Sequence, residues 1–351
     1  MPTILVTGSA GFIGSNFVRF VRTQRPDWRV IAFDALTYAG NLENLSDCLH
    51  DGVCRFIRGD IADGRALEPC FADGLDAVVN FAAESHVDRS ILGAQEFVRT
   101  NVIGLQVLLD LARTYPVRRF LQVSTDEVYG SLGSEGFFSE ETPLAPNSPY
   151  SASKAAADLL ARAYHKTFDL PILVTRCSNN YGPYQFPEKL IPLFVTNLLG
   201  KQRVPLYGDG LNVRDWIHVE DHCEALLTVL EQAPPGSTYN IGGRRELPNI
   251  EIARRILQHL GHDESWIQYV KDRPGHDRRY SVDIARIERD LGWRPRIDFE
   301  KGLAQTIEWY RTNEPWWRRI KTGDYLTYYE KQYGRRDSGG RTVGGVVGAD
   351  R

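Results

Sequence analysis

Two short stretches carry side chains whose types and spacing could perform acid–base chemistry. The first, "STDEVYG" at 124–130, follows the apolar run "RRFLQV" and places Asp126 next to Glu127 behind a Ser-Thr pair. The second, "YSASK", places Tyr150 four residues before Lys154 at the start of an expected helix, so the two side chains share one helix face. A lysine ammonium near a phenol favours the phenolate and lowers the tyrosine pKa, which would make Tyr150 a general base.

The adjacent carboxyl groups of Asp126 and Glu127 need a reason to stand at the end of a buried strand. On a solvated turn they would carry no energetic cost. In a cleft, desolvation would disfavour their charged forms, so such a pair is expected there only if the chemistry uses it. The interpretation therefore depends on what else the chain brings to the same place.

A glycine-rich loop suits the binding of a dinucleotide. "TGSAGFIG" places Gly8, Gly11 and Gly14 between an apolar strand and an amphipathic helix, in a G-x-x-G-x-x-G spacing. Such glycines permit a tight turn and a close approach of the backbone to pyrophosphate. Asp34 ends the second strand, where an acid can hold the adenosine ribose 2′-hydroxyl, and its charge would repel a 2′-phosphate. The loop therefore predicts NAD rather than NADP.

The elements that must position these groups read as alternating strands and helices. Apolar runs at "TILVTG", "WRVIAFD", "CRFIRGD", "DAVVNFAA" and "RRFLQVST" are separated by segments with helical periodicity. This alternation predicts an α/β fold with a doubly wound parallel sheet of the Rossmann type. Right-handed crossovers would then bring the strand C-termini to one edge, where ligands bind.

The regular alternation of strands and helices changes past about residue 180, where Pro, Tyr and Gly become frequent. We expect a Rossmann domain over 1–178, partly completed by 212–235, and a smaller, interleaved substrate domain over 179–330. The Gly- and Arg-rich segment 335–351 has no periodicity and is expected to be disordered.

Composition excludes several classes of protein. The 351 residues carry a formal net charge of −3 without a long basic block, so neither nucleic acid nor a membrane surface is an expected partner. Five scattered cysteines without a C-x-x-C pair fit reduced thiols. The N-terminal strand leaves no room for a signal peptide, so a cytoplasmic location is expected. His218 and His222 lie four apart but lack the H-E-x-x-H pattern, and no metal is expected.

The conjunction of these motifs resembles the extended short-chain dehydrogenase/reductase family, over nearly the whole chain to about residue 330. Within it, "STDEVYG" resembles the signature of nucleotide-sugar 4,6-dehydratases, and the Thr-Asp-Glu order resembles the dTDP-glucose type. GDP-mannose dehydratases are similar but typically have Ser in place of the Asp. A simple 4-epimerase has no use for two acids, whereas elimination of water beside a new carbonyl needs both a base and an acid.

The resemblance implies a set of site residues. The catalytic ones are Thr125, Asp126, Glu127, Tyr150 and Lys154. The cofactor NAD would contact Gly8, Gly11, Phe12, Ile13, Gly14, Asp34, Leu36, Thr37, Asp60, Ile61, Ala82, Ala83, Ser85, Thr100, Tyr150, Lys154 and Asn180. The nucleotide-sugar substrate, dTDP-glucose, would contact His86, Thr125, Asn179, Lys189, Leu190, Pro205, Tyr207, Arg214, Asn249, Arg273 and His276.

The resemblance also implies a mechanism. Tyr150 as phenolate would take the proton of the 4-hydroxyl while hydride passes from C4 to NAD⁺, with Thr125 bound to O4. Glu127 would then remove the C5 proton, and protonated Asp126 would donate to the departing 6-hydroxyl. Return of hydride to C6 would give a 4-keto-6-deoxy sugar, as in rhamnose-type deoxysugar biosynthesis. For this role the pKa of Asp126 must be raised by burial and by its acidic neighbour.

Three alternatives remain open at this point. The chain could be a UDP-glucose 4,6-dehydratase, or another NAD-dependent epimerase or decarboxylase of nucleotide sugars. It could also be a cofactor-sensing protein that has lost the chemistry, although Tyr150, Lys154 and the acid pair are all present. Members of the family commonly pair through two long helices, here near 95–114 and 149–168, so a homodimer is expected.

Overall fold

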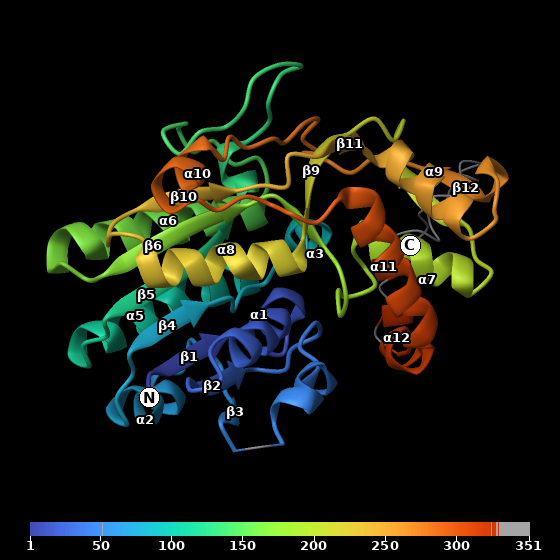
Figure 1. Ribbon diagram of the computed structural model, residues 1–351. Helices are drawn as coiled ribbons and strands as arrows, with labels where there is room; N and C mark the ends of the chain where they lie inside the picture. Colours follow the sequence, from blue (N-terminus) through green and yellow to red (C-terminus); the bar gives the residue numbers. More distant parts are fainter. Residues whose placement is uncertain (51, 324, 328, 330–351) are drawn as a thin grey trace, which may run out of the picture.

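The computed structural model describes residues 1–50, 52–323, 325–327 and 329. The expectation for residues 335–351 lies outside the described residues. Within these residues two groups of elements are visible, a large sheet with flanking helices and a smaller group that carries α7, α9, α11 and α12 (Figure 1).

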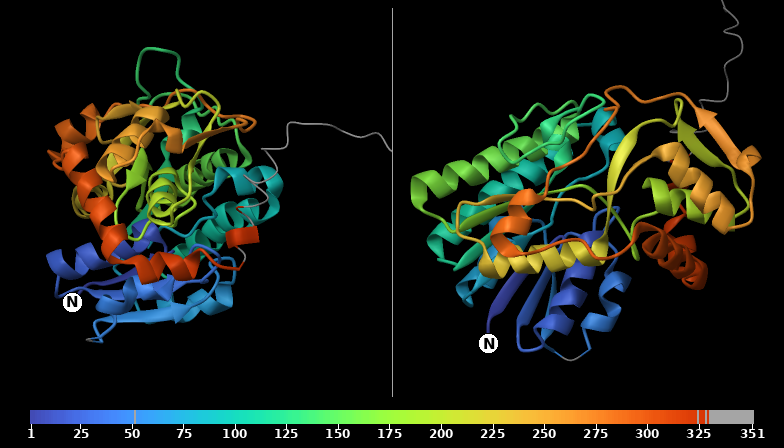
Figure 2. Two further views of the ribbon diagram at one scale, coloured as in Figure 1. Left: turned by 90° about the vertical axis from the view of Figure 1, so that its right-hand side faces the viewer. Right: turned by 45° about the horizontal axis from the view of Figure 1, so that its top comes forward.

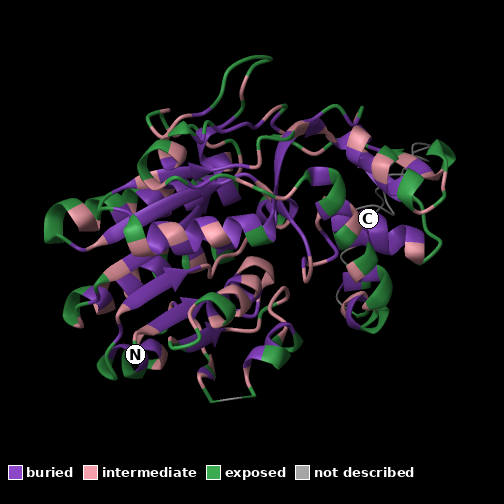
Figure 3. Ribbon diagram, viewed as in Figure 1, coloured by how far each residue is buried: buried purple, intermediate pink, exposed green. Residues whose placement is uncertain are grey.

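The central sheet confirms the predicted α/β class. Its seven strands are all parallel and follow the order β10-β6-β5-β4-β1-β2-β3. Apart from the edge strand β3, the strands are buried along almost their whole length, as expected for a sheet covered on both faces (Figure 3). Their bounds are β1 (Thr3–Thr7), β2 (Arg29–Asp34), β3 (Cys54–Arg58), β4 (Ala77–Asn80), β5 (Arg119–Thr125), β6 (Ile172–Cys177) and β10 (Thr238–Ile241).

Helices cover the two faces of this sheet and form two separate hydrophobic cores. One core joins the sheet to α1 (Phe12–Gln24), α8 (Val219–Gln232) and α10 (Ala285–Leu291). The other joins it to α2 (Gly64–Ala72), α5 (Leu105–Thr114) and α6 (Pro149–Phe168). Figure 2 shows these helices on opposite sides of the strands.

The strand order places a topological switch between β1 and β4. From β1 the chain moves outward to β2 and β3, and then returns to β4 on the other side of β1. In open α/β sheets the crevice at such a point, beside the carboxyl ends of the strands, is where ligands bind. The glycine loop follows β1 directly, so it lies at this crevice.

A smaller group of elements has its own hydrophobic core. It contains a three-stranded sheet of order β11-β9-β7 and a two-stranded sheet of β12 and β8. The strands are β7 (Asn179–Tyr181), β8 (Val204–Tyr207), β9 (Val213–His218), β11 (Glu246–Pro248) and β12 (Ile267–Val270), and the helices are α7 (Leu190–Leu199), α9 (Asn249–His259), α11 (Phe299–Thr312) and α12 (Glu314–Ile320).

The two groups are tied together by the chain and by side chains. Segment 212–235 forms β9 in the smaller group and continues into α8, which packs on α1 of the larger one. The indole Nε1 of Trp316 in α12 donates to Asn44 Oδ1 at 2.9 Å, and Asn44 lies in the short helix η1 (Leu42–Cys48) after β2. The groups are therefore interleaved rather than joined by a single linker.

The remaining short helices are α3 (Val87–Leu92), α4 (Gln95–Val98), the π-helical turn η2 (Arg99–Gly104), η3 (Asp126–Tyr129) and η4 (Glu264–Trp266). Thus α4, η2 and α5 form one nearly continuous helical stretch where the sequence predicted a single helix. In the part of the chain described here, no helix combines the length and the apolar character needed to cross a bilayer.

Candidate active site

Helix α6 begins where the Tyr-Lys motif begins. Ser148 caps the helix by accepting from the backbone N–H of Ser151, whose own side chain bonds back to the cap residue, and Pro149 occupies the first turn. Tyr150 therefore stands in the first turn and Lys154 one turn later, both buried. The Lys154 Nζ donates to the carbonyl of Val123 in β5 at 2.7 Å, which directs the ammonium toward the end of that strand.

Strand β5 ends at Thr125 because the chain turns there into the short helix η3. The Thr125 hydroxyl accepts from the backbone N–H of Glu127 at 3.3 Å and so caps the new helix. This turn places Asp126 and Glu127 immediately beyond the strand, at the edge of the sheet that also holds the glycine loop. Asp126 is 2% exposed.

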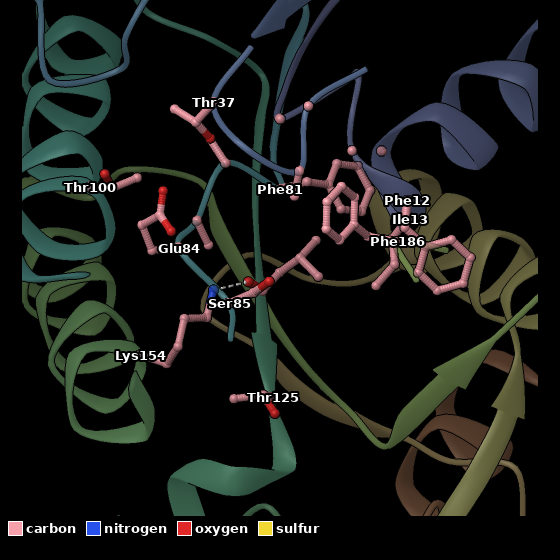
Figure 4. Close-up of a pocket in the computed structure, with 18 of the residues that line it drawn as sticks. Phe12, Ile13, Thr37, Phe81, Glu84, Ser85, Thr100, Thr125, Lys154 and Phe186 are labelled. Carbon is pink, nitrogen blue, oxygen red and sulfur yellow. Dashed lines mark hydrogen bonds between the residues drawn. The ribbon is translucent and has the colours of Figure 1, made fainter. Parts of the chain in front are cut away.

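A cavity of about 320 Å³ collects the predicted groups from both halves of the site. Its lining contains all five predicted catalytic residues and every predicted cofactor residue except Leu36. Figure 4 shows Lys154 reaching in from α6, Thr125 at the end of β5, and Phe12 and Ile13 at the start of α1 on the opposite side. Leu36 instead packs against the core beside the cavity, and its backbone N–H serves Asp34.

The glycine loop has the close contacts that a dinucleotide site requires. Gly8 has a positive φ of 66°, and a Cβ there would lie 2.5 Å from the backbone nitrogen of Ala82. A Cβ on Gly14 would lie 2.2 Å from the carbonyl oxygen of Gly8. The helix therefore begins close against the strand turn, and its first residues line the cavity.

Asp34 links this loop to the next one. Its Oδ2 accepts from Ala10 N at 2.9 Å and its Oδ1 from Leu36 N at 2.7 Å. Burial raises the pKa of Asp34, and these two backbone donors oppose that rise. Each carboxylate oxygen keeps a further lone pair for a ribose hydroxyl. The residues at this end of the cavity therefore fit a dinucleotide without a 2′-phosphate.

The two acids differ in the charges that surround them. Burial, Glu127 and Asp215 hold the pKa of Asp126 well above its usual range, whereas Arg214 and a hydrogen bond from the Thr125 hydroxyl lower it. Burial also raises the pKa of Glu127, but Arg273, Lys189 and Arg214 all lower it. The expected direction for Asp126 is thus confirmed, and the surroundings separate the acids into a better proton donor and a better proton acceptor.

Tyr150 differs from the sequence-based expectation. Burial, followed by the charge of Glu127, raises the pKa of its phenol well above the ordinary value, and a hydrogen bond from Thr125 lowers it. Burial and the charge of Glu127 therefore outweigh any lowering of the Tyr150 pKa by Lys154, whose own pKa is lowered by burial and whose ammonium donates to the carbonyl of Val123. The role of Tyr150 as general base stays a prediction.

The predicted substrate residues fall into two sets. Asn179 and Lys189 line the cavity together with Thr125. Lys189 precedes α7, and its Nζ donates to the carbonyl of Ser85 at 2.8 Å. The others lie outside the cavity lining: His86, Leu190, Pro205, Tyr207, Arg214, Asn249, Arg273 and His276.

Several of these outer residues meet around an acid that sequence reasoning did not single out. Asp88 accepts from Arg273 at 2.9 Å and from the Tyr207 hydroxyl at 2.7 Å, and the ring of His276 lies 6.1 Å from that of Tyr207. The Arg214 guanidinium stacks over Tyr280 at 4.4 Å. Arg273 and Arg214 also act on the Glu127 pKa, so this cluster borders the catalytic acids.

Other residues missed by sequence reasoning lie in the cavity wall itself. Glu188, Glu84 and Phe186 line it. Glu188 pairs with Arg89 at 3.1 Å, and the Arg89 guanidinium lies 3.9 Å from the centre of the Tyr38 ring. The only signal in the sequence was position, since Glu188 stands next to Lys189 and Glu84 lies within "AAESHVDRS".

The histidine pair considered for a metal lies in the protein interior. His222 Nδ1 bonds to Asn180 Oδ1 at 2.8 Å, and burial lowers the pKa of His218 to about 4 and that of His222 to about 3. Among the residues that the structure describes, no three or more His, Cys, Asp or Glu side chains are arranged to hold a metal ion.

A doubly wound sheet whose glycine loop and Tyr-Lys pair share one cavity defines the class of extended short-chain dehydrogenase/reductases. The family model described as GDP-mannose 4,6 dehydratase matches residues 5–306. Relatives called dTDP-glucose 4,6-dehydratase include one from Xanthomonas campestris pv. campestris, 52% identical with 93% of this chain and 97% of the relative covered, and one from Streptomyces griseus, 55% identical with 90% and 96% covered.

Solved structures give the same result. A dTDP-glucose 4,6-dehydratase from Bacillus anthracis, in complex with NAD, is 51% identical with a TM-score of 0.86, covering 92% of this chain and 100% of that one. The enzyme of the same name from Streptomyces venezuelae, also with NAD, is 54% identical with a TM-score of 0.89, covering 91% and 100%. This chain belongs to the dTDP-glucose 4,6-dehydratase family.

The glycine loop gives a direct test of the site. Replacement of Gly14 by Ala would force a Cβ to within 2.2 Å of the Gly8 carbonyl oxygen. Overpacking of this kind costs about 1–3 kcal/mol, so Gly14→Ala should lower the free energy of unfolding and weaken retention of the dinucleotide. Chemical denaturation and quantification of bound cofactor would measure both effects.

Gly93→Ala is the matched control, because no atom lies within 4 Å of its added Cβ and its φ is extended. Equal stability and equal cofactor content in the two variants would contradict the close packing described for the glycine loop.

Proposed function

We propose that this protein converts dTDP-glucose to dTDP-4-keto-6-deoxyglucose and water, with tightly bound NAD, in the biosynthesis of a deoxysugar. The observation that carries the proposal is the acid pair Asp126 and Glu127, which lines the same cavity as Tyr150, Lys154 and the glycine loop. The names of the relatives support the same substrate, and the Asp at 126 favours it over the GDP-mannose type.

The cavity residues fit NAD through the glycine loop, Asp34, and the Lys154 ammonium. The chemistry that bound NAD⁺ supplies is reversible uptake of hydride, first from C4 of the sugar and finally back to C6. Tyr150 accepts the proton of the 4-hydroxyl in its phenolate form, and the Thr125 hydroxyl holds O4. The negative charge of Glu127 raises the pKa of the Tyr150 phenol and so disfavours the phenolate. The cations Arg273, Lys189 and Arg214 around Glu127 offset that charge and therefore favour the phenolate.

The elimination follows from the different pKa directions of the two acids. A 4-keto group acidifies the C5 proton, and Glu127, flanked by Arg273, Lys189 and Arg214, is the carboxylate that removes it. Asp126, kept protonated by burial and by two neighbouring carboxyl groups, donates its proton to the 6-hydroxyl, which leaves as water. The C5–H and C6–O bonds break and one carbon–carbon double bond forms, so the step balances.

We assign residues 1–178, with 212–235, to NAD binding and residues 179–330 to the nucleotide sugar. The separate hydrophobic core of the second segment and its cations around Asp88 support this division. A cytoplasmic location fits an enzyme that uses NAD and a nucleotide sugar.

Amide variants test the roles of the acid pair. Asp126→Asn and Glu127→Gln should each lower formation of the 4-keto-6-deoxy sugar by about 10²–10⁴-fold, because one proton transfer loses its partner. Oxidation at C4 should persist, so a single turnover should show reduced nicotinamide by its absorbance. Glu141→Gln, at a side chain 91% exposed, is the control and should behave as the unmodified protein.

The alternatives predict other outcomes for the same variants. A cofactor-sensing protein would form no product with any variant, and an epimerase would convert dTDP-glucose or UDP-glucose to its 4-epimer without loss of water. If only UDP-glucose gives the dehydrated product, the assigned substrate changes from a thymidine to a uridine nucleotide sugar. The acid–base assignment would then still hold.

We further propose that two copies pair through the helices near 95–114 and 149–168. Exposed apolar side chains on these elements support this, since Val98, Ile103 and Leu159 are 48%, 47% and 56% exposed. Ile103→Glu combined with Leu159→Glu should yield a monomer in light scattering, whereas Leu211→Glu, at an equally exposed apolar residue outside these helices, should not. A dimer that survives the double change would contradict this interface.

A further inference from the structure

One buried acid near the site has no part in the mechanism above. Asp158 stands on α6 one helical turn after Lys154 and two turns after Tyr150, so the three side chains share a helix face. It is 3% exposed and does not line the cavity, so it cannot touch the substrate. A carboxyl group so far from solvent needs a compensating partner.

Its partner is Arg176 on β6, whose Nε lies 2.8 Å from Asp158 Oδ2. Arg176 also donates to the Tyr129 hydroxyl at 2.9 Å, and it stands opposite Ser124 in the register of β5 and β6. The ion pair therefore joins α6 to β6, and β6 pairs with β5, the strand that ends at Thr125. Burial raises the pKa of Asp158, and the adjacent guanidinium opposes the rise and favours the carboxylate.

The surroundings of Lys154 contain few charges. On its own helix the charge that acts on it is Asp158, on β5 it bonds to the carbonyl of Val123, and on β6 the thiol of Cys177 acts on it. Burial raises the pKa of that thiol to about 12, so it is neutral at ordinary pH. Burial lowers the pKa of Lys154, and Asp158 is the largest influence that opposes this.

We propose that Asp158 is a positioning residue that acts through Lys154: it favours the charged form of the buried ammonium, while Arg176 keeps Asp158 ionised. The assignment rests on the proposed function, in which Lys154 holds the nicotinamide ribose and supports Tyr150. Asp158 lies one helical turn from Lys154, is paired with Arg176 and does not line the cavity. Its carboxylate therefore acts on Lys154 from outside the cavity lining and does not compete with the 4-hydroxyl.

A purely structural ion pair is the competing explanation, because removing one member of a buried pair is destabilising in any protein. Three variants separate the two roles. Asp158→Asn removes the counter-charge. Asp158→Asn with Arg176→Gln removes it without leaving an unpaired guanidinium, and so keeps the test available if the single variant does not fold. Arg176→Lys keeps both charges and disturbs only the geometry.

The experiment measures the pH dependence of kcat for dTDP-glucose and, separately, the acetylation of Lys154 by acetic anhydride, quantified by mass spectrometry against Lys166 on the same helix. Acetylation requires the neutral amine, so its midpoint reports the pKa of Lys154. Loss of a neighbouring charge shifts a pKa by about one unit or more. Asp158→Asn should therefore lose activity on the alkaline side about one pH unit earlier, and its Lys154 should acetylate at correspondingly lower pH. The double variant should shift both midpoints in the same direction but by less, because loss of the Arg176 cation partly offsets loss of the carboxylate.

Arg176→Lys should keep both midpoints and lose only stability. Unchanged midpoints in the Asp158→Asn variants, with lower stability or kcat, would overturn the proposal and leave a structural pair. Failure of the unmodified protein to act on dTDP-glucose would count against the proposed function instead, and the acetylation midpoints would still decide the role of Asp158.

Discussion

The site depends on the desolvation of two adjacent carboxyl groups. Asp126 and Glu127 leave β5 together and enter a cavity where burial disfavours the charge of each. Two such groups can serve as acid and base only if their surroundings differ. Here the difference comes from cations, because Lys189 and Arg273 act on Glu127, whereas the charges that act on Asp126 are chiefly carboxylates.

This requirement explains why the two groups of elements are interleaved. The acids come from the central sheet, but the cations come from the start of α7, from β9 and from the loop after β12. Strand β9 carries Arg214 and Asp215 and then continues into α8, which packs on α1 beside the glycine loop. The cofactor end and the substrate end of the cavity are thereby held at a fixed separation by one stretch of chain. Asp88, which binds both Arg273 and Tyr207, completes the link from the sheet side.

The features that sequence could predict are those with local causes. The parallel sheet follows from buried strands alternating with amphipathic helices, and the glycine loop and the Tyr150–Lys154 pair follow from spacing along one element. The glycine loop and the Tyr150–Lys154 pair are expected to line one cavity because the carboxyl ends of parallel strands lie at the same edge of the sheet. Leu36 is the predicted cofactor residue that lies outside the cavity lining; its backbone N–H donates to Asp34, and its contact with the cofactor stays a prediction.

What sequence could not provide are pairings between distant segments. Arg273 and Asp88 are 185 residues apart, and Arg89 and Glu188 are 99 apart, with no pattern that joins them. The effect of Glu127 on the Tyr150 pKa could not be predicted for the same reason, because Glu127 lies 23 positions earlier in the chain and acts through space. The roles of Asp158 and Arg176 likewise become visible only when α6 is packed on β6.

The most direct test of the account is to incubate the purified protein with dTDP-glucose in deuterated water and follow the sugar by NMR. Removal of the C5 proton by Glu127, followed by reprotonation from solvent, predicts a 4-keto-6-deoxy product with deuterium at C5. A product without deuterium at C5, or a 4-epimer that retains its 6-hydroxyl, would contradict the assignment of Glu127 as the base and Asp126 as the acid.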